Sequence, residues 1–235
     1  MKIKRKTLAI FLAGMMLFLF VMHLVLMTST TDNAMYWELA QFFDMDTEIS
    51  LPTWYSTVVL LFVPAVLLFY IGYYKKMAGD KEAWYWFLSS GMMLFLSIDD
   101  GAMIHEKFTT INRLSGLQGI LDSWSIDLFA WSWWVIYVPL GLALLVILMK
   151  WFLKLPRRTQ ILMAAAVLLA FIGQIGLEIY NGYRTNISAE YIGPVWRGWQ
   201  KFVGRGGLSL FLFAVVDYIG LMPAKEKKSL RIDVV

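Results

Sequence analysis

The chain has 235 residues, of which 59% are hydrophobic and only 16% are charged, and its mean hydropathy is +0.62. Soluble domains carry about 25% charged residues, so this composition excludes an ordinary soluble domain. Cysteine is absent, which excludes disulfides, thiolate metal sites and thioether-linked haem. The small net charge of +4 gives no reason to expect nucleic-acid binding, and we expect contact with a lipid bilayer instead.

Apolar runs long enough to cross a bilayer, which takes about 18–20 residues, recur along the whole chain. The sequence therefore predicts an all-α fold, a six-transmembrane-helix bundle forming a single polytopic membrane domain over residues 1–235. The expected spans are about 8–27, 54–74, 84–104, 126–149, 160–180 and 206–222. We favour a retained first span over a cleaved signal peptide, because the run exceeds a typical signal h-region and no small-x-small cleavage site follows it. Residues 35–43 predict a short helix lying in the membrane interface.

The distribution of basic residues predicts the topology of these spans. Six spans place both termini on one side, and 15 of the 21 Lys and Arg residues fall on that side. Because cytoplasmic loops are enriched in Lys and Arg, we expect both termini to be cytoplasmic. We accordingly expect an integral protein of a plasma membrane, the inner membrane if the source is a bacterium.

The stretch from Ser97 to Glu106 holds the most reactive set of side chains in the chain. It ends the third expected span and contains Asp99, Asp100, His105 and Glu106. Ionisable residues at the end of a membrane helix are costly and usually functional. If the helix continued through this stretch, Asp99 and Glu106 would lie on one face, because they are seven residues apart.

A set of carboxylates and histidine without cysteine is the ligand chemistry of Zn, Fe or Mn. The metal ligands that we expect are Asp99, His105, Glu106 and Glu178; less favoured ligands are His23, Asp100 and Glu48. Few basic residues lie near these acids in the sequence, so clustered acids would repel one another unless protonated or bound to a metal. The alternative is structural, with the acids capping the next segment or pairing with Lys107, Arg113 or Arg184.

Two further acids lie inside apolar helices. Glu178 is flanked by Ile175, Leu177 and Ile179 and therefore needs a partner or a proton. Asp217 lies in the half of the last span that faces the cytoplasm, and we interpret it as the partner of a basic residue at that border. A b-type haem between His23 and His105 is a less favoured use of the histidines, since it does not require the acidic neighbours.

Two segments resemble a family of uncharacterised bacterial polytopic membrane proteins. One is Glu48–Ser56, with Pro-Thr-Trp before a span, and the other is Leu94–Glu106, with an Asp-acid-x-x-x-x-His-Glu stretch that ends the next span. Gly176–Glu178 resembles a third element, whereas Gln200 and Gly204 stand where the family carries an acidic element. The resemblance implies these residues as a site and implies no particular reaction.

Three functional hypotheses from different classes follow. The first is a metal-binding membrane protein with its site at the outer face, and the sequence leaves open whether it is an enzyme such as a hydrolase or an oxidase. The second is an accessory or assembly subunit that binds other membrane subunits. The third is a transporter with Gln174, Glu178 and Asp217 along its path, although no inverted repeat is visible.

Overall fold

The computed structural model describes residues 2–29, 33–107, 110, 134–177, 179–181, 184, 193–223 and 233–234, and the fold is all-α apart from two dipeptide strands. The helices are α1 (Arg5–Thr28), α2 (Ala34–Phe42), α3 (Leu51–Trp54), α4 (Val63–Met77), α5 (Ala83–Ala102), α8 (Trp134–Phe152), α9 (Arg157–Phe171) and α11 (Pro194–Leu221). Two π-helical segments, η1 (Tyr55–Phe62) and η3 (Ile172–Gly176), continue α3 into α4 and extend α9.

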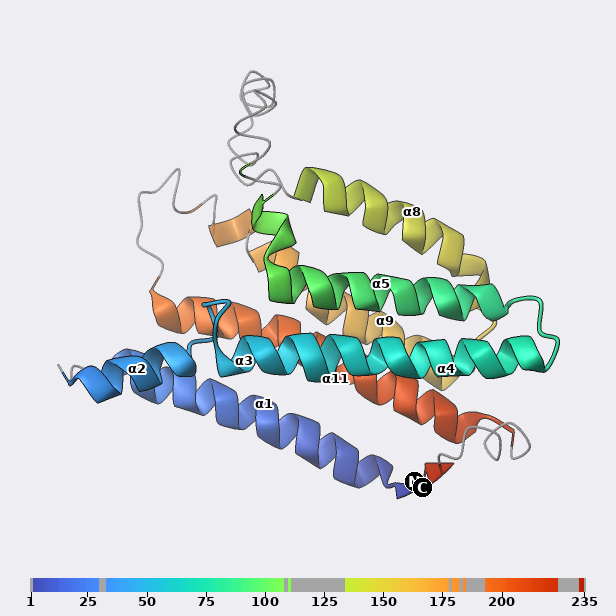
Figure 1. Cartoon of the computed structure of the whole chain (residues 1–235), viewed down its shortest axis with the longest axis horizontal. Helices are drawn as coiled ribbons and strands as arrows, with labels where there is room; N and C mark the ends of the chain where they lie inside the picture. The colour runs from blue at the N-terminus through green and yellow to red at the C-terminus, as the bar shows by residue number, and fades with distance from the viewer. Residues whose placement is uncertain are drawn as a thin grey trace, which may run out of the picture.

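The long helices run side by side as one bundle, and the two termini lie together at one end of it (Figure 1). There the strands β1 (Lys2–Ile3) and β2 (Asp233–Val234) pair in parallel. We call this the basic end, because the described Lys and Arg residues of the termini and of the 78–82 and 153–156 connections gather there. The opposite end, which carries residues 43–50 and 103–107, is the acidic end.

Four helical stretches of the described residues are long and apolar enough to cross a membrane: Arg5–Thr28, Leu51–Met77, Arg157–Asn181 and Pro194–Leu221. A shorter apolar helix covers Tyr137–Phe152, and α5 runs antiparallel to α4 over 20 residues. The expectation of an all-α protein with apolar helices of membrane-spanning length is confirmed. The count of six crossings and the cytoplasmic placement of the termini stay predictions.

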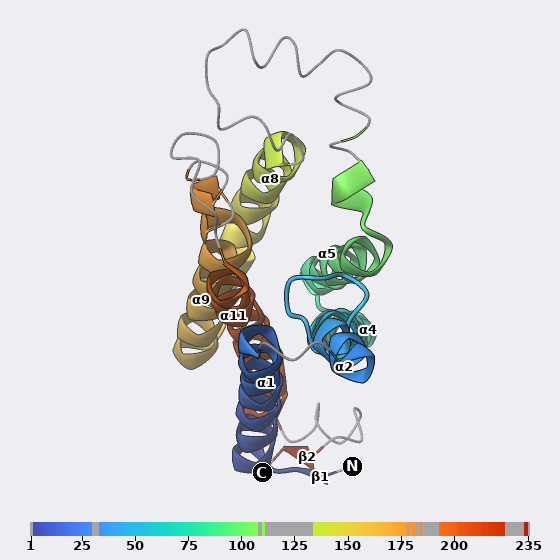
Figure 2. The ribbon, with the colours of Figure 1, turned by 90° about the vertical axis from the view of Figure 1, so that its left-hand side faces the viewer.

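Helix α11 lies at the centre of the packing and contacts α1, α9, η3, η1 and α4. Its approach to α9 and η3 depends on glycine: a Cβ on Gly207 would overlap the backbone of Ala170, and one on Gly173 would overlap Gly204. Small residues let membrane helices pack backbone against backbone, where lipid offers no hydrophobic driving force. The end view in Figure 2 shows α11 between α9 and α1.

Serine side chains join α5 to the η1–α4 helix. Ser97 donates a hydrogen bond to the carbonyl of Thr57 at 2.9 Å, and Ser90 donates to that of Ala65 at 2.7 Å. Such bonds hold apolar helices together because each polar group would otherwise lie unpaired among apolar side chains. They set the register that brings Asp99 and Asp100 beside η1.

At the basic end, Asp217 of α11 is fully buried. Its carboxylate forms ion pairs with Arg5 at 3.2 Å and Arg158 at 2.9 Å. The interpretation of Asp217 as the partner of a basic residue is therefore confirmed, with two partners rather than one. The two arginines clamp the start of α1 and the start of α9 onto the end of α11.

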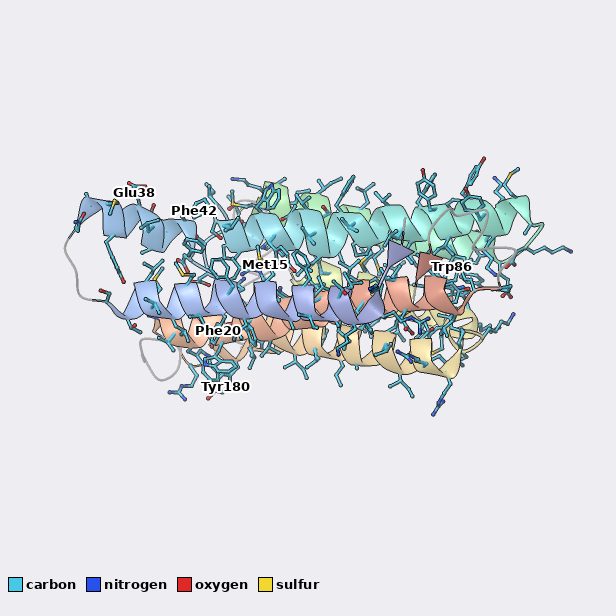
Figure 3. The ribbon with its side chains drawn as sticks, turned by 90° about the horizontal axis from the view of Figure 1, so that it is seen from below. Met15, Phe20, Glu38, Phe42, Trp86 and Tyr180 are labelled. Carbon is cyan, nitrogen blue, oxygen red and sulfur yellow. The ribbon has the colours of Figure 1, made fainter. Side chains whose placement is uncertain are left out.

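Helix α2 forms as expected, but it runs antiparallel along the last third of α1, as Figure 3 shows at the side chains of Phe42 and Glu38. Tyr36 donates to the carbonyls of Val25 and Leu26, and Phe43 packs edge-on against Phe18. The amphipathic pattern of residues 35–43 predicts a helix with one polar face. The pattern does not specify the direction in which this helix runs, which is determined by its contacts with α1.

Candidate metal group at the acidic end

The end of α5 differs from the continuous helix expected through residue 104. The helix ends at Ala102, because Met103 adopts a left-handed conformation with φ 56°. Residues 104–107 then form a separate helical turn, and the backbone N–H of His105 donates to Oδ1 of Asp99 at 2.8 Å. The expectation that Asp99 and Glu106 share one helix face was wrong, since seven-residue spacing applies only to an unbroken helix.

The turn folds His105 back onto Asp99. Nδ1 of His105 lies 3.2 Å from Oδ2 of Asp99, and Nε2 lies 3.5 Å from Oε1 of Glu48. Tyr137 of α8 donates to Oδ1 of Asp99 at 2.8 Å. Burial by itself lowers the pKa of His105, but the two carboxylates raise it to about 10. A metal ion at Nε2 would therefore have to take the place of a proton.

Glu48, His105 and Glu106 each offer one ligand atom, and these three atoms lie within 4.8 Å of one another. Two members come from the turn after α5, and the third comes from the connection between α2 and α3. Asp99 contacts the other nitrogen of the His105 ring. A carboxylate on the far nitrogen of a ligating histidine orients the ring and increases its basicity.

Asp100 points to a different place. Its Oδ2 accepts hydrogen bonds from Ser56 and Thr57 of η1, both at 2.7 Å. The Cβ of a side chain at Gly101 would lie 3.2 Å from the methyl group of Thr57, so α5 and η1 are in close contact here. Asp100 thus joins two helices and is not among the three clustered ligand atoms.

His23 is completely buried in α1, and both of its ring nitrogens are engaged. Nε2 lies 3.1 Å from the carbonyl of Pro194, and Nδ1 accepts from the N–H of Met45 at 3.1 Å, with Oδ1 of Asp44 3.3 Å away. The imidazole therefore joins α1, the start of α11 and the 43–50 segment. It lies apart from the His105 group, and its place fits a packed structural histidine.

Arg205 is the residue that sequence reasoning missed. It lies in α11, is 4% exposed, and donates to the carbonyl of Met45 and the hydroxyl of Thr53, both at 2.9 Å. Met45 lies between Asp44 and Asp46, so the guanidinium is held beside the acids of the 43–50 segment. The argument that few cations lie near the acids was therefore wrong. The available signal was an arginine between Gly204 and Gly206 at the start of an apolar helix run.

Glu178, the fourth expected ligand, lies outside the described residues. The segments on either side of it are described, namely η3 and residues 179–181. The π-helical form of η3 is notable because π-helical turns occur frequently at functional sites. Gln174 of that segment contacts α11, where a Cβ on Gly204 would lie 3.0 Å from its side chain.

Comparison with known proteins places the chain in one family. A family model described as a domain of unknown function (DUF8692) matches residues 8–203. No curated protein and no solved structure matches the chain. The matched range includes the turn after α5 that carries His105 and Glu106 and the connection that carries Glu48.

Proposed function

Because the chain belongs to the family of unknown function DUF8692, we propose its function from its own side chains: it is an integral membrane protein that binds a divalent metal ion near the acidic end. The ligands in this proposal are Glu48, His105 and Glu106, with Zn, Fe or Mn as the ion. The observation that carries it is the clustering of the three ligand atoms within 4.8 Å.

Asp99 and Glu178 have different roles in the proposal. Asp99 is a positioning residue, because its carboxylate lies beside Nδ1 of His105, while Nε2 faces the carboxylate of Glu48. We include Glu178 in the ligand set from the sequence, since it comes two residues after η3 in the chain. A carboxylate among Ile175, Leu177 and Ile179 gains most from such a partner.

The ion would supply Lewis-acid activation of a water or a carbonyl oxygen, the chemistry that hydrolytic metal sites use. The chain's own contribution is an imidazole held by Asp99, one carboxylate from the turn after α5 and one from the connection between α2 and α3. Arg205 offsets part of their negative charge and holds the 43–50 segment that carries Glu48.

The proposed topology has six crossings, with the basic end in the cytoplasm and the acidic end facing outward in a bacterial inner membrane. The support is the gathering of basic residues with the termini at one end of the bundle (Figure 1): Lys4, Arg5, Lys6, Lys75, Lys76, Lys81, Lys150, Lys154, Arg157 and Arg158. Cytoplasmic enrichment of Lys and Arg is the general rule.

Elemental analysis of the purified protein tests the metal proposal. We expect about one Zn, Fe or Mn per chain after purification without chelators, and loss of that ion in Glu48→Gln and His105→Gln. The matched control is Glu38→Gln, the same chemical change on an exposed face of α2, as Figure 3 shows. A parent protein that holds no ion, even after incubation with each metal, would exclude the metal proposal and favour the accessory-subunit function. Copurification of other membrane subunits in a fixed ratio would then support that accessory-subunit function.

A further inference from the structure

Contacts between helices determine the level of Asp99 along the bundle. Near the basic end, Trp86 of α5 packs against Trp151 of α8 and Tyr218 of α11, with ring centroids 4.8 and 4.7 Å apart. Asp99 follows Trp86 by thirteen residues, and its partner Tyr137 precedes Trp151 by fourteen. At 1.5 Å per residue, both helices place Asp99 about 20 Å from the Trp86 level.

Helix α11 gives the same level independently. Arg205 precedes Tyr218 by thirteen residues, which again corresponds to about 20 Å. Beyond Arg205, α11 continues for eleven residues to Pro194, or about 16 Å farther. There it meets His23 of α1, so α1 and α11 both extend well past the level of the candidate metal group.

The Trp86 level has the features of a membrane interface. The exposed rings of Trp84 of α5 and Tyr73 of α4 adjoin this level, beside the ion pairs of the basic end, and Figure 3 shows Trp86 close to that end of the bundle. Trp and Tyr are enriched where a helix crosses from headgroups into hydrocarbon. Since the hydrocarbon is about 30 Å thick, Asp99 and Arg205 lie about 10 Å short of its far boundary.

Exposed apolar side chains adjoin the ligand residues at this level. Ile49, next to Glu48, is 86% exposed, and Ile98, next to Asp99, is 51% exposed. Trp54 of α3 is exposed as well. At the same depth the charged groups pair with one another, as ionisable residues inside membranes do. The cluster of Glu48, His105 and Glu106 therefore lies next to exposed apolar side chains at a depth inside the leaflet, and not at the membrane surface.

We infer that the metal group takes a membrane-dissolved amphiphile as its substrate class, one that reaches it from the outer leaflet with an oxygen-rich headgroup toward His105 and its chain in the lipid. This inference rests on the proposed function. A water-soluble substrate would have to reach a group that lies below the ends of α1 and α11, among exposed apolar side chains.

The depth is tested without any metal. The chain has no cysteine, so single cysteines carry a nitroxide label unambiguously. In bilayer nanodiscs, labels at Ile49→Cys and Ile98→Cys should be relaxed more by oxygen than by a water-soluble nickel chelate, as a label at the exposed Ile10→Cys of α1 should be. Labels at Thr28→Cys and Ala78→Cys, at the two ends, should show the reverse. Labels at 49 and 98 that resemble those at 28 and 78 would overturn the inference.

The substrate class is tested on cobalt-loaded protein in nanodiscs, because Co²⁺ reports its ligands by visible absorption. Dodecyl hydroxamate and acetohydroxamate present the same metal-binding headgroup with and without a chain. We expect the long-chain compound to change the spectrum at a more than tenfold lower total concentration. Equal potency would overturn the inference and leave the metal proposal standing. Absence of any cobalt spectrum in the parent would overturn the metal proposal itself.

Discussion

Tyr137 of α8 donates a 2.8 Å hydrogen bond to Oδ1 of Asp99 in α5, while Oδ2 of the same carboxylate lies 3.2 Å from Nδ1 of His105. One carboxylate thus connects a phenol on one helix with an imidazole on a turn. Away from its two ends, α8 is mostly exposed. The Tyr137 contact is therefore part of what attaches α8 to the bundle at the acidic end.

Tyr137→Phe should weaken metal binding by roughly 10–100-fold, the usual effect of removing a group that orients a ligating histidine. The change deletes one hydroxyl and leaves the ring packed near Phe95. Competition with a fluorescent chelator measures the affinity. Tyr73→Phe, at an exposed tyrosine of α4, is the control and should bind like the parent. Equal metal affinity for both variants would show that the hydrogen bond from Tyr137 to Asp99 does not contribute to metal binding.

Arg205→Leu should destabilise the fold by roughly 3–5 kcal/mol, because it removes a buried cation and leaves half-buried carboxylates without their counter-charge. It also removes the hydrogen bonds to Met45 and Thr53. Arg197→Leu removes a partly exposed ion pair with Asp46 and should cost less than about 1 kcal/mol. Thermal unfolding in detergent compares the two variants. Similar midpoints for both would mean that Arg205 is not the main counter-charge of this end.

Gly198→Ala should destabilise the junction of α1 and α11 by roughly 1–3 kcal/mol, as overpacking of a well-packed interior does. The added Cβ would overlap the His23 ring. Gly14→Ala in α1 meets open space and should leave stability unchanged or slightly increase it. Thermal unfolding again provides the measurement. If Gly198→Ala is as stable as the parent, the His23 ring is not held tightly against α11.

Glu178→Gln should lower the metal content of the purified protein without lowering its yield in the membrane. Glu178→Leu should lose the ion as well and still fold, because the residue stands among apolar neighbours in the sequence and replacing an ionic group by an apolar one in such surroundings is often tolerated. Glu38→Gln is the control for metal content. Full metal content in both Glu178 variants would remove this residue from the ligand set.

A reporter fused after residue 118 should be external, and one fused after residue 228 should be cytoplasmic. The reason is the bias of basic residues, 15 of 21, toward the side of the termini. A pair of enzymatic reporters, one active only outside the cytoplasm and one active only inside, distinguishes the sides. Finding both fusions on the same side would contradict six crossings.

Hydropathy by itself determined that the chain forms apolar helices of membrane-spanning length, and their order along the chain. This signal is local: each run is apolar because of its own residues, whatever packs against it. The sequence also placed Asp99 and His105 in one candidate site, because they are only six positions apart. The break at Met103 was not predicted, because a left-handed non-glycine residue leaves no mark in composition.

Only the tertiary structure brought Glu48 to His105 and Arg205 to the acids. Arg205 and Met45 are 160 residues apart, and His23 and Met45 are 22 apart. Such contacts depend on which helix packs against which, and that choice is made by side-chain fit and by glycine at crossings such as Gly173 and Gly207. Local patterns of charge and hydropathy do not contain that information. They therefore ranked Glu48 low among the candidate ligands and did not place Arg205 of α11 beside the 43–50 segment.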